Sequence, residues 1–211
     1  MSFQDRTRRF LILSVLGFIL GAGIAGLSIL MESGDKNQGH QESLPFVAPH
    51  IGGPFHLINQ DGKAVTDKDF AGKYLLIYFG FASCPAICPT ELQKITNTYQ
   101  SLSKDWQDRI QPIFITIDPE RDTPDILKDY VALFLPHMVG LTGTTDQIEK
   151  VKKAYKVYGA KVPEGTSYTM DHSSFIYFMG PDTKPLAMFR VSDTADKMTR
   201  TIQTLGINAQ Q

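Results

Sequence analysis

Two cysteines in the segment 81–89 are the residues whose type and spacing most clearly suggest chemistry. Cys84 and Cys88 stand four positions apart, and Pro85 and Pro89 follow them directly. Residues at i and i+4 lie on one side of a helical turn, so the two thiols converge if a helix begins here. A helix start favours thiolate over thiol, because it presents free N–H groups and the positive end of the helix dipole. The prolines restrict the backbone and stiffen the loop. We therefore expect two convergent thiolates in a rigid setting.

Such a pair can bind a soft metal or exchange with disulfides. Soft thiolates select Cu(I), zinc or iron–sulfur clusters. Structural zinc usually takes four ligands, and the chain has only two cysteines. One added imidazole would complete a three-coordinate set that Cu(I) accepts and Cu(II) tolerates. The alternative is a redox disulfide between Cys84 and Cys88. A disulfide that closes such a short loop stabilises the fold very little. We therefore expect the two cysteines to serve a chemical function rather than a structural one.

His172 is the best candidate for the imidazole. It directly precedes a predicted strand at 174–179, and a parallel neighbour in the sheet would bring it to the edge that carries the cysteines. A single histidine beside a strand is more often a polar core or surface residue, so the residues alone leave its role open. His40 and His50 read as solvent-exposed histidines of a linker, and Met170 as a packing residue.

The elements around these residues alternate between strand and helix. A continuous apolar run at 74–79 predicts a strand buried on both faces, at the centre of a mostly parallel sheet. The alternation predicts an α/β sandwich, with the cysteines at the carboxyl edge of the sheet, where α/β proteins place their sites. The remaining expected elements are a hairpin over 55–66, helices over 89–102, from 123, over 145–155 and over 195–205, strands at 110–117 and 140–143, a loop at 161–169, and a hairpin formed by 174–179 with 186–190.

The N-terminal part differs in composition from the rest. Residues 10–30 contain no charged side chain, and a helix of that length rises roughly 30 Å, about the bilayer core. Arg6, Arg8 and Arg9 precede the run, which places the N-terminus in the cytoplasm by the positive-inside rule. A cleaved signal peptide is the alternative. The expected organisation is a cytoplasmic N-terminus (1–9), a transmembrane anchor (10–30), a flexible tether (31–51) and a folded domain (52–211).

Overall charge limits the partners. The formal net charge is -1 in 211 residues, and no long basic run occurs. Nucleic-acid binding therefore has no electrostatic support.

Several motifs together resemble one family. The segment Gly80-Phe81, Cys84-Pro85-x-x-Cys88-Pro89 and Glu91-Leu92 resembles the Sco/SenC family of cytochrome oxidase assembly proteins. Together the motifs are very specific, whereas a CxxxC spacing by itself would be weak. Four further stretches match: Gly53-Pro54-Phe55 with Asp61-Gly62, residues 117–124, Gly140-Leu141-Thr142-Gly143, and Met170-Asp171-His172-Ser173-Ser174.

The resemblance implies a thioredoxin-like fold, with a mixed central sheet flanked by helices and an N-terminal β-hairpin extension. It implies copper, as Cu(I) or Cu(II), held by Cys84, Cys88 and His172. It implies a metallochaperone rather than an enzyme, with the copper-bearing subunit of a cytochrome c oxidase, and other copper chaperones, as partners. With the anchor, it implies a single-pass protein of the inner membrane whose C-terminal domain faces the periplasm.

The alternative function is that of a membrane-anchored thiol–disulfide oxidoreductase that reduces the cysteines of a partner's copper site. The cysteine pattern of peroxiredoxin-type peroxidases is absent.

Two features near the cysteines remain to be placed. The family commonly has Asp where this chain has Ala86, so no function that needs an acid there is expected. Asp118 ends a predicted strand and either supports a metal ligand or belongs to a turn. Glu120 and Asp122 are expected to serve turn and N-cap chemistry.

Overall fold

The computed structural model describes residues 51–208, and strand β3 (Tyr74–Gly80) is an inner strand of its main sheet. All seven residues of β3 are buried, as the apolar run predicts. Strand β4 (Ile110–Thr116) runs parallel to β3 on one side, and β8 (Phe175–Met179) runs antiparallel on the other. The sheet is therefore mixed, and β8 begins at the edge where β3 ends.

The sheet has seven strands in the order β2-β1-β5-β4-β3-β8-β9. Parallel pairing joins β3, β4 and β5, whereas the outer strands on both sides are antiparallel. The predicted N-terminal hairpin is present as β1 and β2, and it extends the sheet beyond β5. The remaining strands of this sheet are β1 (His56–Asn59), β2 (Ala64–Thr66), β5 (Val139–Thr142) and β9 (Pro185–Arg190).

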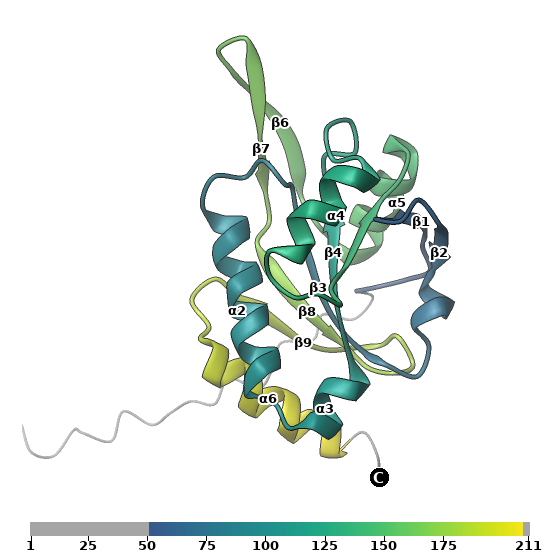
Figure 1. Ribbon diagram of the computed structural model, residues 1–211, viewed down its shortest axis with the longest axis vertical. Helices are drawn as coiled ribbons and strands as arrows, with labels where there is room; N and C mark the ends of the chain where they lie inside the picture. Colours follow the sequence, from purple (N-terminus) through teal and green to yellow (C-terminus); the bar gives the residue numbers. More distant parts are fainter. Residues whose placement is uncertain (1–50, 209–211) are drawn as a thin grey trace, which may run out of the picture. The chain divides into compact units, whose positions relative to one another are not determined.

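Helices cover both faces of the sheet (Figure 1). Helix α2 (Ile87–Ser101) packs against α6 (Ala195–Asn208), and α4 (Pro124–Ala132) lies on the same side of the sheet. Helix α5 (Thr145–Tyr155) lies behind the sheet in this view. The side chain of Thr123 caps α4, and that of Thr144 caps α5. Two short helices were not predicted, the 3-10 helix η1 (Asp67–Phe70) and α3 (Lys104–Arg109).

The alternation of side chains along β3 divides the core into two layers. On one face, the Tyr78 ring lies 6.4 Å from that of Phe114. On the other, the Phe79 ring lies 5.3 Å from that of Tyr155 on α5. The cysteine-bearing helix α2 covers the face that carries Tyr78.

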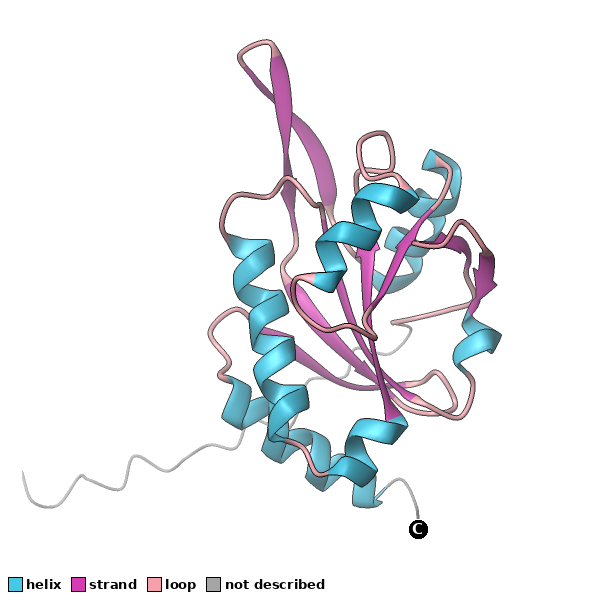
Figure 2. Cartoon of the chain, in the orientation of Figure 1, coloured by secondary structure: helices cyan, strands magenta, loops and turns pink. Residues whose placement is uncertain are grey.

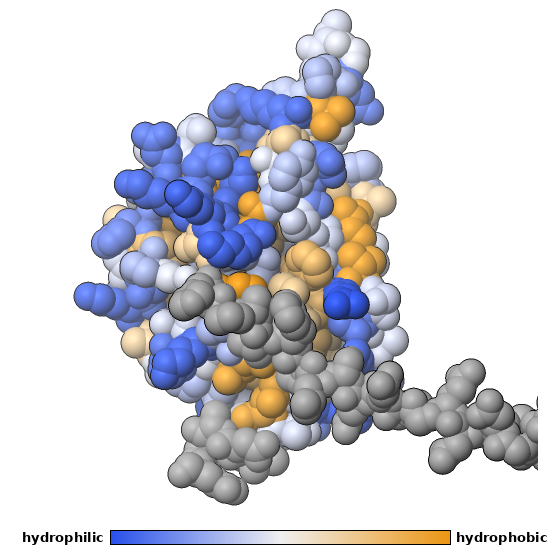
Figure 3. Space-filling view, turned by 180° about the vertical axis from the view of Figure 1, so that it is seen from behind, coloured by the Kyte–Doolittle hydropathy of each residue, from blue (hydrophilic) through white to orange (hydrophobic). Residues whose placement is uncertain are grey.

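A second, two-stranded sheet projects from one end of the molecule (Figures 1 and 2). It consists of β6 (Gly159–Glu164) and β7 (Ser167–His172), paired along their whole length. The prediction of a loop at 161–169 was therefore wrong. Figure 3 shows the molecule from behind, with hydrophilic side chains predominating and hydrophobic ones gathered in separate patches.

This mixed sheet between helices, extended by an N-terminal hairpin, confirms the predicted thioredoxin-like α/β fold. The predicted anchor (10–30) and tether (31–51) lie almost wholly outside the described residues and stay predictions. Within residues 51–208, no helix combines the length and the apolar character needed to cross a bilayer.

Candidate metal centre

The cysteines lie in the connection from β3 to α2. After β3 ends at Gly80, the chain turns so that the Cys84 N–H donates to the Phe81 carbonyl over 3.1 Å. Helix α2 begins at Ile87, so Cys88 belongs to its first turn. Cys88 is fully buried, and Cys84 is 7% exposed. The backbone N–H of Cys88 points at the Cys84 sulfur, with a nitrogen–sulfur distance of 3.4 Å.

His172 is the last residue of β7, at the foot of the projecting hairpin. Its Nε2 lies 3.6 Å from the Cys88 sulfur. Its Nδ1 lies 2.9 Å from the Ser173 carbonyl oxygen, which can only accept, so Nδ1 carries the proton. That tautomer leaves the Nε2 lone pair directed towards the sulfurs. The ring of Phe81 meets the imidazole edge-on, with centroids 5.8 Å apart.

The structure thus brings the three predicted residues together. The sulfurs of Cys84 and Cys88 and a ring nitrogen of His172 lie within 4.8 Å of one another, and residues 51–208 contain no second group of this kind. Two soft sulfurs from buried cysteines and one partly buried imidazole fit a copper ion better than structural zinc, which would need a fourth ligand. The prediction that a parallel neighbour delivers His172 was wrong, because β8 is antiparallel to β3.

One proton is shared unequally between the thiols. The Cys88 thiol donates a hydrogen bond to the Cys84 sulfur, and this bond, joined by that of the Cys88 N–H and against the effect of burial, lowers the pKa of Cys84 from 9.0 to about 4. The same bond, together with burial, raises the pKa of Cys88 far above its usual value. The site therefore holds a Cys84 thiolate and a Cys88 thiol at neutral pH.

Strand β3 supports Cys88 from beneath. The Tyr78 hydroxyl lies 3.6 Å from the Cys88 sulfur and donates to it. A Cβ atom at Gly80 would stand 2.7 Å from the same sulfur and 3.1 Å from the Phe114 ring. Glycine at this position therefore lets the strand approach the cysteine closely.

Ala86 occupies the N-cap position of α2, without a side chain that could accept a hydrogen bond. The third helical residue is Pro89, which has no N–H, so only the Cys88 N–H lies within reach of a capping oxygen. In this chain that N–H is free to serve the Cys84 sulfur instead.

The acidic residues between β4 and α4 do more than form a turn. Asp118 is 1% exposed and accepts from Arg121 and from Tyr168 of β7. Asp122 is equally buried, and it accepts from the Ala82 N–H in the cysteine loop over 3.0 Å. The expectation of turn and N-cap chemistry for Asp122 was therefore wrong. No sequence signal distinguished Asp122 from its acidic neighbours.

The other residues considered lie elsewhere. Glu120 forms a surface ion pair with Lys161 of β6 at 2.6 Å. Met170 is 9% exposed and belongs to the apolar core, which agrees with its predicted packing role. His40 and His50 lie outside the residues that the structure describes.

Comparison with known proteins places this geometry in a family. The SCO1/SenC family model matches residues 46–206. The mitochondrial protein SCO1 of Saccharomyces cerevisiae is 45% identical over 137 residues, which are 64% of this chain and 46% of the yeast protein. This chain therefore spans about half the length of that relative.

Two solved structures share the fold. The Arabidopsis thaliana ScoI crystal structure with copper bound has a TM-score of 0.70 and 38% identity, covering 76% of this chain and 99% of that one. BsSco, described as a member of the Sco family of cytochrome c oxidase assembly proteins with a disulfide switch, has a TM-score of 0.61 and 30% identity, covering 77% and 96%. From its motifs, its fold and the extent of the family match, this chain belongs to the SCO1/SenC family.

Proposed function

We propose that this chain is a copper metallochaperone that binds one copper ion through the sulfurs of Cys84 and Cys88 and Nε2 of His172. The observation that carries the proposal is the approach of these three donor atoms to within 4.8 Å of one another. The copper bound by the Arabidopsis relative supports copper as the metal. Copper is the cargo here, and the chain supplies the ligands.

The protonation state suits copper uptake and release. Cys84 already offers a thiolate, whereas Cys88 must lose its proton as a metal binds. Copper binding should therefore release about one proton per ion near neutral pH. The Ser173 carbonyl holds the His172 ring in the tautomer that can ligate, the usual arrangement for a metal-binding imidazole.

We infer that the receiving partner is the copper-bearing subunit of a cytochrome c oxidase, whose dicopper centre the chain helps to assemble. Support comes from BsSco, which belongs to a family of oxidase assembly proteins. Other copper chaperones would supply the ion. The uncharged run at 10–30 would anchor the chain in the inner membrane, with the tether carrying the domain on the periplasmic side.

A Cu(I) competition titration of the purified full chain tests the site. We expect one tightly bound ion per chain, a sharp loss of affinity in His172→Ala, and no binding when both cysteines become alanine. His56→Ala is the matched control, because His56 is exposed on β1 and should leave affinity unchanged. Unaltered Cu(I) affinity in His172→Ala would refute the three-ligand site.

The low pKa of Cys84 favours a second candidate, a thiol–disulfide reductase. The Cys84 thiolate would attack a partner disulfide, forming a mixed disulfide and expelling one partner thiolate. Cys88 would pass its proton to that thiolate and then attack the Cys84 sulfur, which releases the second partner sulfur as a thiolate that takes its proton from water. The partner gains two electrons, and a dithiol reductant must later reduce the Cys84–Cys88 disulfide.

Oxidase assembly in cells separates the two candidates. The reductase needs both cysteines but does not need His172 as a ligand. Loss of oxidase assembly in His172→Ala supports the metallochaperone, and full assembly in that variant supports the reductase.

A further inference from the structure

The connection from β4 to α4 lies against both halves of the candidate site. The cysteines stand on the β3–α2 connection, whereas His172 stands at the foot of the β6–β7 hairpin. Side chains of the segment from Asp118 to Asp122 reach each of these elements. Buried carboxylates are uncommon unless they have partners, and Asp118 and Asp122 are each 1% exposed.

On the cysteine side, Asp122 fixes the loop. Its Oδ2 accepts from the Ala82 N–H over 3.0 Å and from the Thr116 hydroxyl over 2.6 Å. Ala82 stands within the turn that the Cys84 N–H closes on the Phe81 carbonyl. The carboxylate therefore ties the start of the cysteine loop to the end of β4.

On the histidine side, three residues form a closed ring of hydrogen bonds that includes one backbone carbonyl. Arg121 Nε donates to Asp118 Oδ2 over 2.5 Å, and Arg121 Nη1 donates to the Tyr168 carbonyl over 2.9 Å. The Tyr168 hydroxyl donates to Asp118 Oδ1 over 2.9 Å. The guanidinium also lies 3.9 Å above the centre of the Tyr168 ring. Charge-assisted bonds of this kind fix geometry as well as adding stability.

Tyr168 transmits this anchoring to the ligand. It stands on β7 four residues before His172, and the alternation of a strand places both residues on one face. Among the described residues β7 pairs only with β6, and a two-stranded ribbon is marginally stable without outside support. Lys152 holds the foot of β6 through the Gly159 carbonyl, whereas the Asp118–Arg121 pair holds β7.

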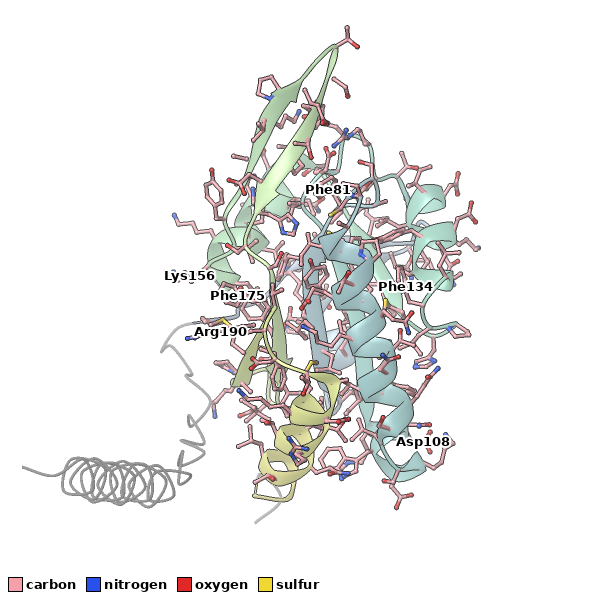
Figure 4. All side chains as sticks on the ribbon, turned by 90° about the vertical axis from the view of Figure 1, so that its left-hand side faces the viewer. Phe81, Asp108, Phe134, Lys156, Phe175 and Arg190 are labelled. Atoms are coloured by element: carbon pink, nitrogen blue, oxygen red, sulfur yellow. The ribbon has the colours of Figure 1, made fainter. Side chains whose placement is uncertain are left out.

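Phe81 completes the connection between the two halves. It belongs to the cysteine loop, and Figure 4 shows it where the hairpin meets the body of the domain, near the start of α2. The Arg121 guanidinium lies 5.9 Å from the centre of its ring, and the ring meets the His172 imidazole edge-on.

We propose that Asp118, Arg121, Tyr168 and Asp122 form a clamp that holds the His172 imidazole over the cysteine pair. This inference rests on the proposed three-ligand copper site and deepens it. None of the four residues touches copper, so they are positioning residues. Without the clamp, the hairpin moves more freely and the imidazole that β7 carries is no longer held ready for a metal.

The experiment compares Arg121→Met and Tyr168→Phe in the full chain. Tyr168→Phe removes only the bond to Asp118, so it remains informative if Arg121→Met fails to fold. Lys128→Met is the matched control, because it removes the exposed ion pair that Lys128 makes with Asp61 at 3.0 Å. Amide hydrogen exchange on the metal-free protein reports the hairpin, and Cu(I) competition reports the site.

We expect faster exchange in β7 and a 10- to 100-fold weaker Cu(I) affinity in Arg121→Met, roughly the range for residues that support metal ligands. Tyr168→Phe should show both effects more weakly, and Lys128→Met neither. Wild-type exchange in β7 together with wild-type affinity in both variants would overturn the clamp.

A double-mutant cycle shows whether the clamp acts through His172. If it does, Arg121→Met costs no further affinity once His172 is alanine. An equal loss in the His172→Ala background would show that Arg121 acts by another route and overturn the proposal. Unchanged affinity in His172→Ala by itself would instead refute the three-ligand site on which the clamp depends.

Discussion

At the level of single residues, one proton distinguishes the two thiols of the site. Cys84 is the thiolate because the Cys88 thiol donates a hydrogen bond to it. The same hydrogen bond therefore lowers the pKa of Cys84 and raises the pKa of Cys88. The folded protein lowers the pKa of Cys84, so its ionisation contributes stability that is fully present above the unfolded pKa. That contribution is lost as the pH falls towards about 4.

We predict that thiolate absorbance of the reduced, metal-free protein persists until the pH falls to about 4. Cys88→Ala removes the donor and should raise the pKa of Cys84 towards its usual value, whereas Cys88→Ser keeps a donating hydroxyl and should keep the pKa low. An ultraviolet pH titration of the three proteins measures this. Wild-type absorbance that disappears near pH 9.0 would contradict the hydrogen bond.

Ala86, the N-cap residue of α2, has no side chain that can accept a hydrogen bond, which leads to a second prediction. Ala86→Asp supplies an acceptor to the first turn of α2, which should stabilise the protein by about 0.5–2 kcal/mol. The new carboxylate competes for the Cys88 N–H and adds negative charge beside the thiolate, so the pKa of Cys84 should rise. Chemical denaturation and the same titration measure both effects. A lower pKa would show that the Cys88 N–H does not serve Cys84.

The sequence carried different amounts of information about these residues. The spacing of Cys84 and Cys88 predicted converging sulfurs, and the sulfurs do converge, although Cys84 lies in the turn before α2 and only Cys88 lies in the helix. His172 could be assigned only through a family resemblance, since its approach depends on a hairpin and an antiparallel strand. The contact from Asp122 to Ala82 spans 40 positions, and nothing local indicates it.

At the level of elements, the main error was the predicted loop at 161–169, where the structure has the β6–β7 hairpin. Its β6 strand has mostly exposed residues and contains Pro163, and Gly165 lies at its tip. Apolar alternation is the signal for a half-buried strand, and β6, whose residues are mostly exposed, does not produce it. The buried strand β3 was predicted correctly for the opposite reason, because both of its faces are covered.

The end of β3 supplies a prediction about the metal centre. In Gly80→Ala the new methyl group would stand 2.7 Å from the Cys88 sulfur, so that sulfur must move. We expect weaker Cu(I) affinity and a stability loss of about 1–3 kcal/mol from overpacking. Cu(I) competition and denaturation measure the two effects. Wild-type copper affinity in this variant would show that the sulfur position is not critical.

At the level of the whole molecule, α6 and α3 pack together at the end of the domain away from the site (Figure 1). A Cβ atom at Gly206 would overlap the Trp106 ring, and the Tyr74 hydroxyl donates to the Gly206 carbonyl over 3.2 Å. Glycine at this position lets α6 approach α3 closely. None of these residues belongs to the metal centre, so this packing contributes to the stability of the domain. The alternation of elements along the chain predicted this layered architecture but not the antiparallel course of β8.

We predict that Gly206→Ala destabilises the domain by at least about 1–3 kcal/mol, because the methyl group cannot fit beside Trp106. Its copper affinity should stay at the wild-type value, which makes it the matched control for Gly80→Ala. Denaturation followed by Cu(I) competition at a temperature where the variant is folded measures both. A loss of affinity equal to that of Gly80→Ala would show that general destabilisation explains both variants.

X-ray absorption at the copper edge of the Cu(I)-loaded full chain tests the central claim most directly, since it identifies the atoms bound to the metal. We predict two sulfur neighbours and one nitrogen neighbour per copper ion, with the nitrogen signal lost in His172→Ala. A copper ion with sulfur neighbours alone, or a spectrum that His172→Ala leaves unchanged, would contradict the assignment of His172 as a ligand.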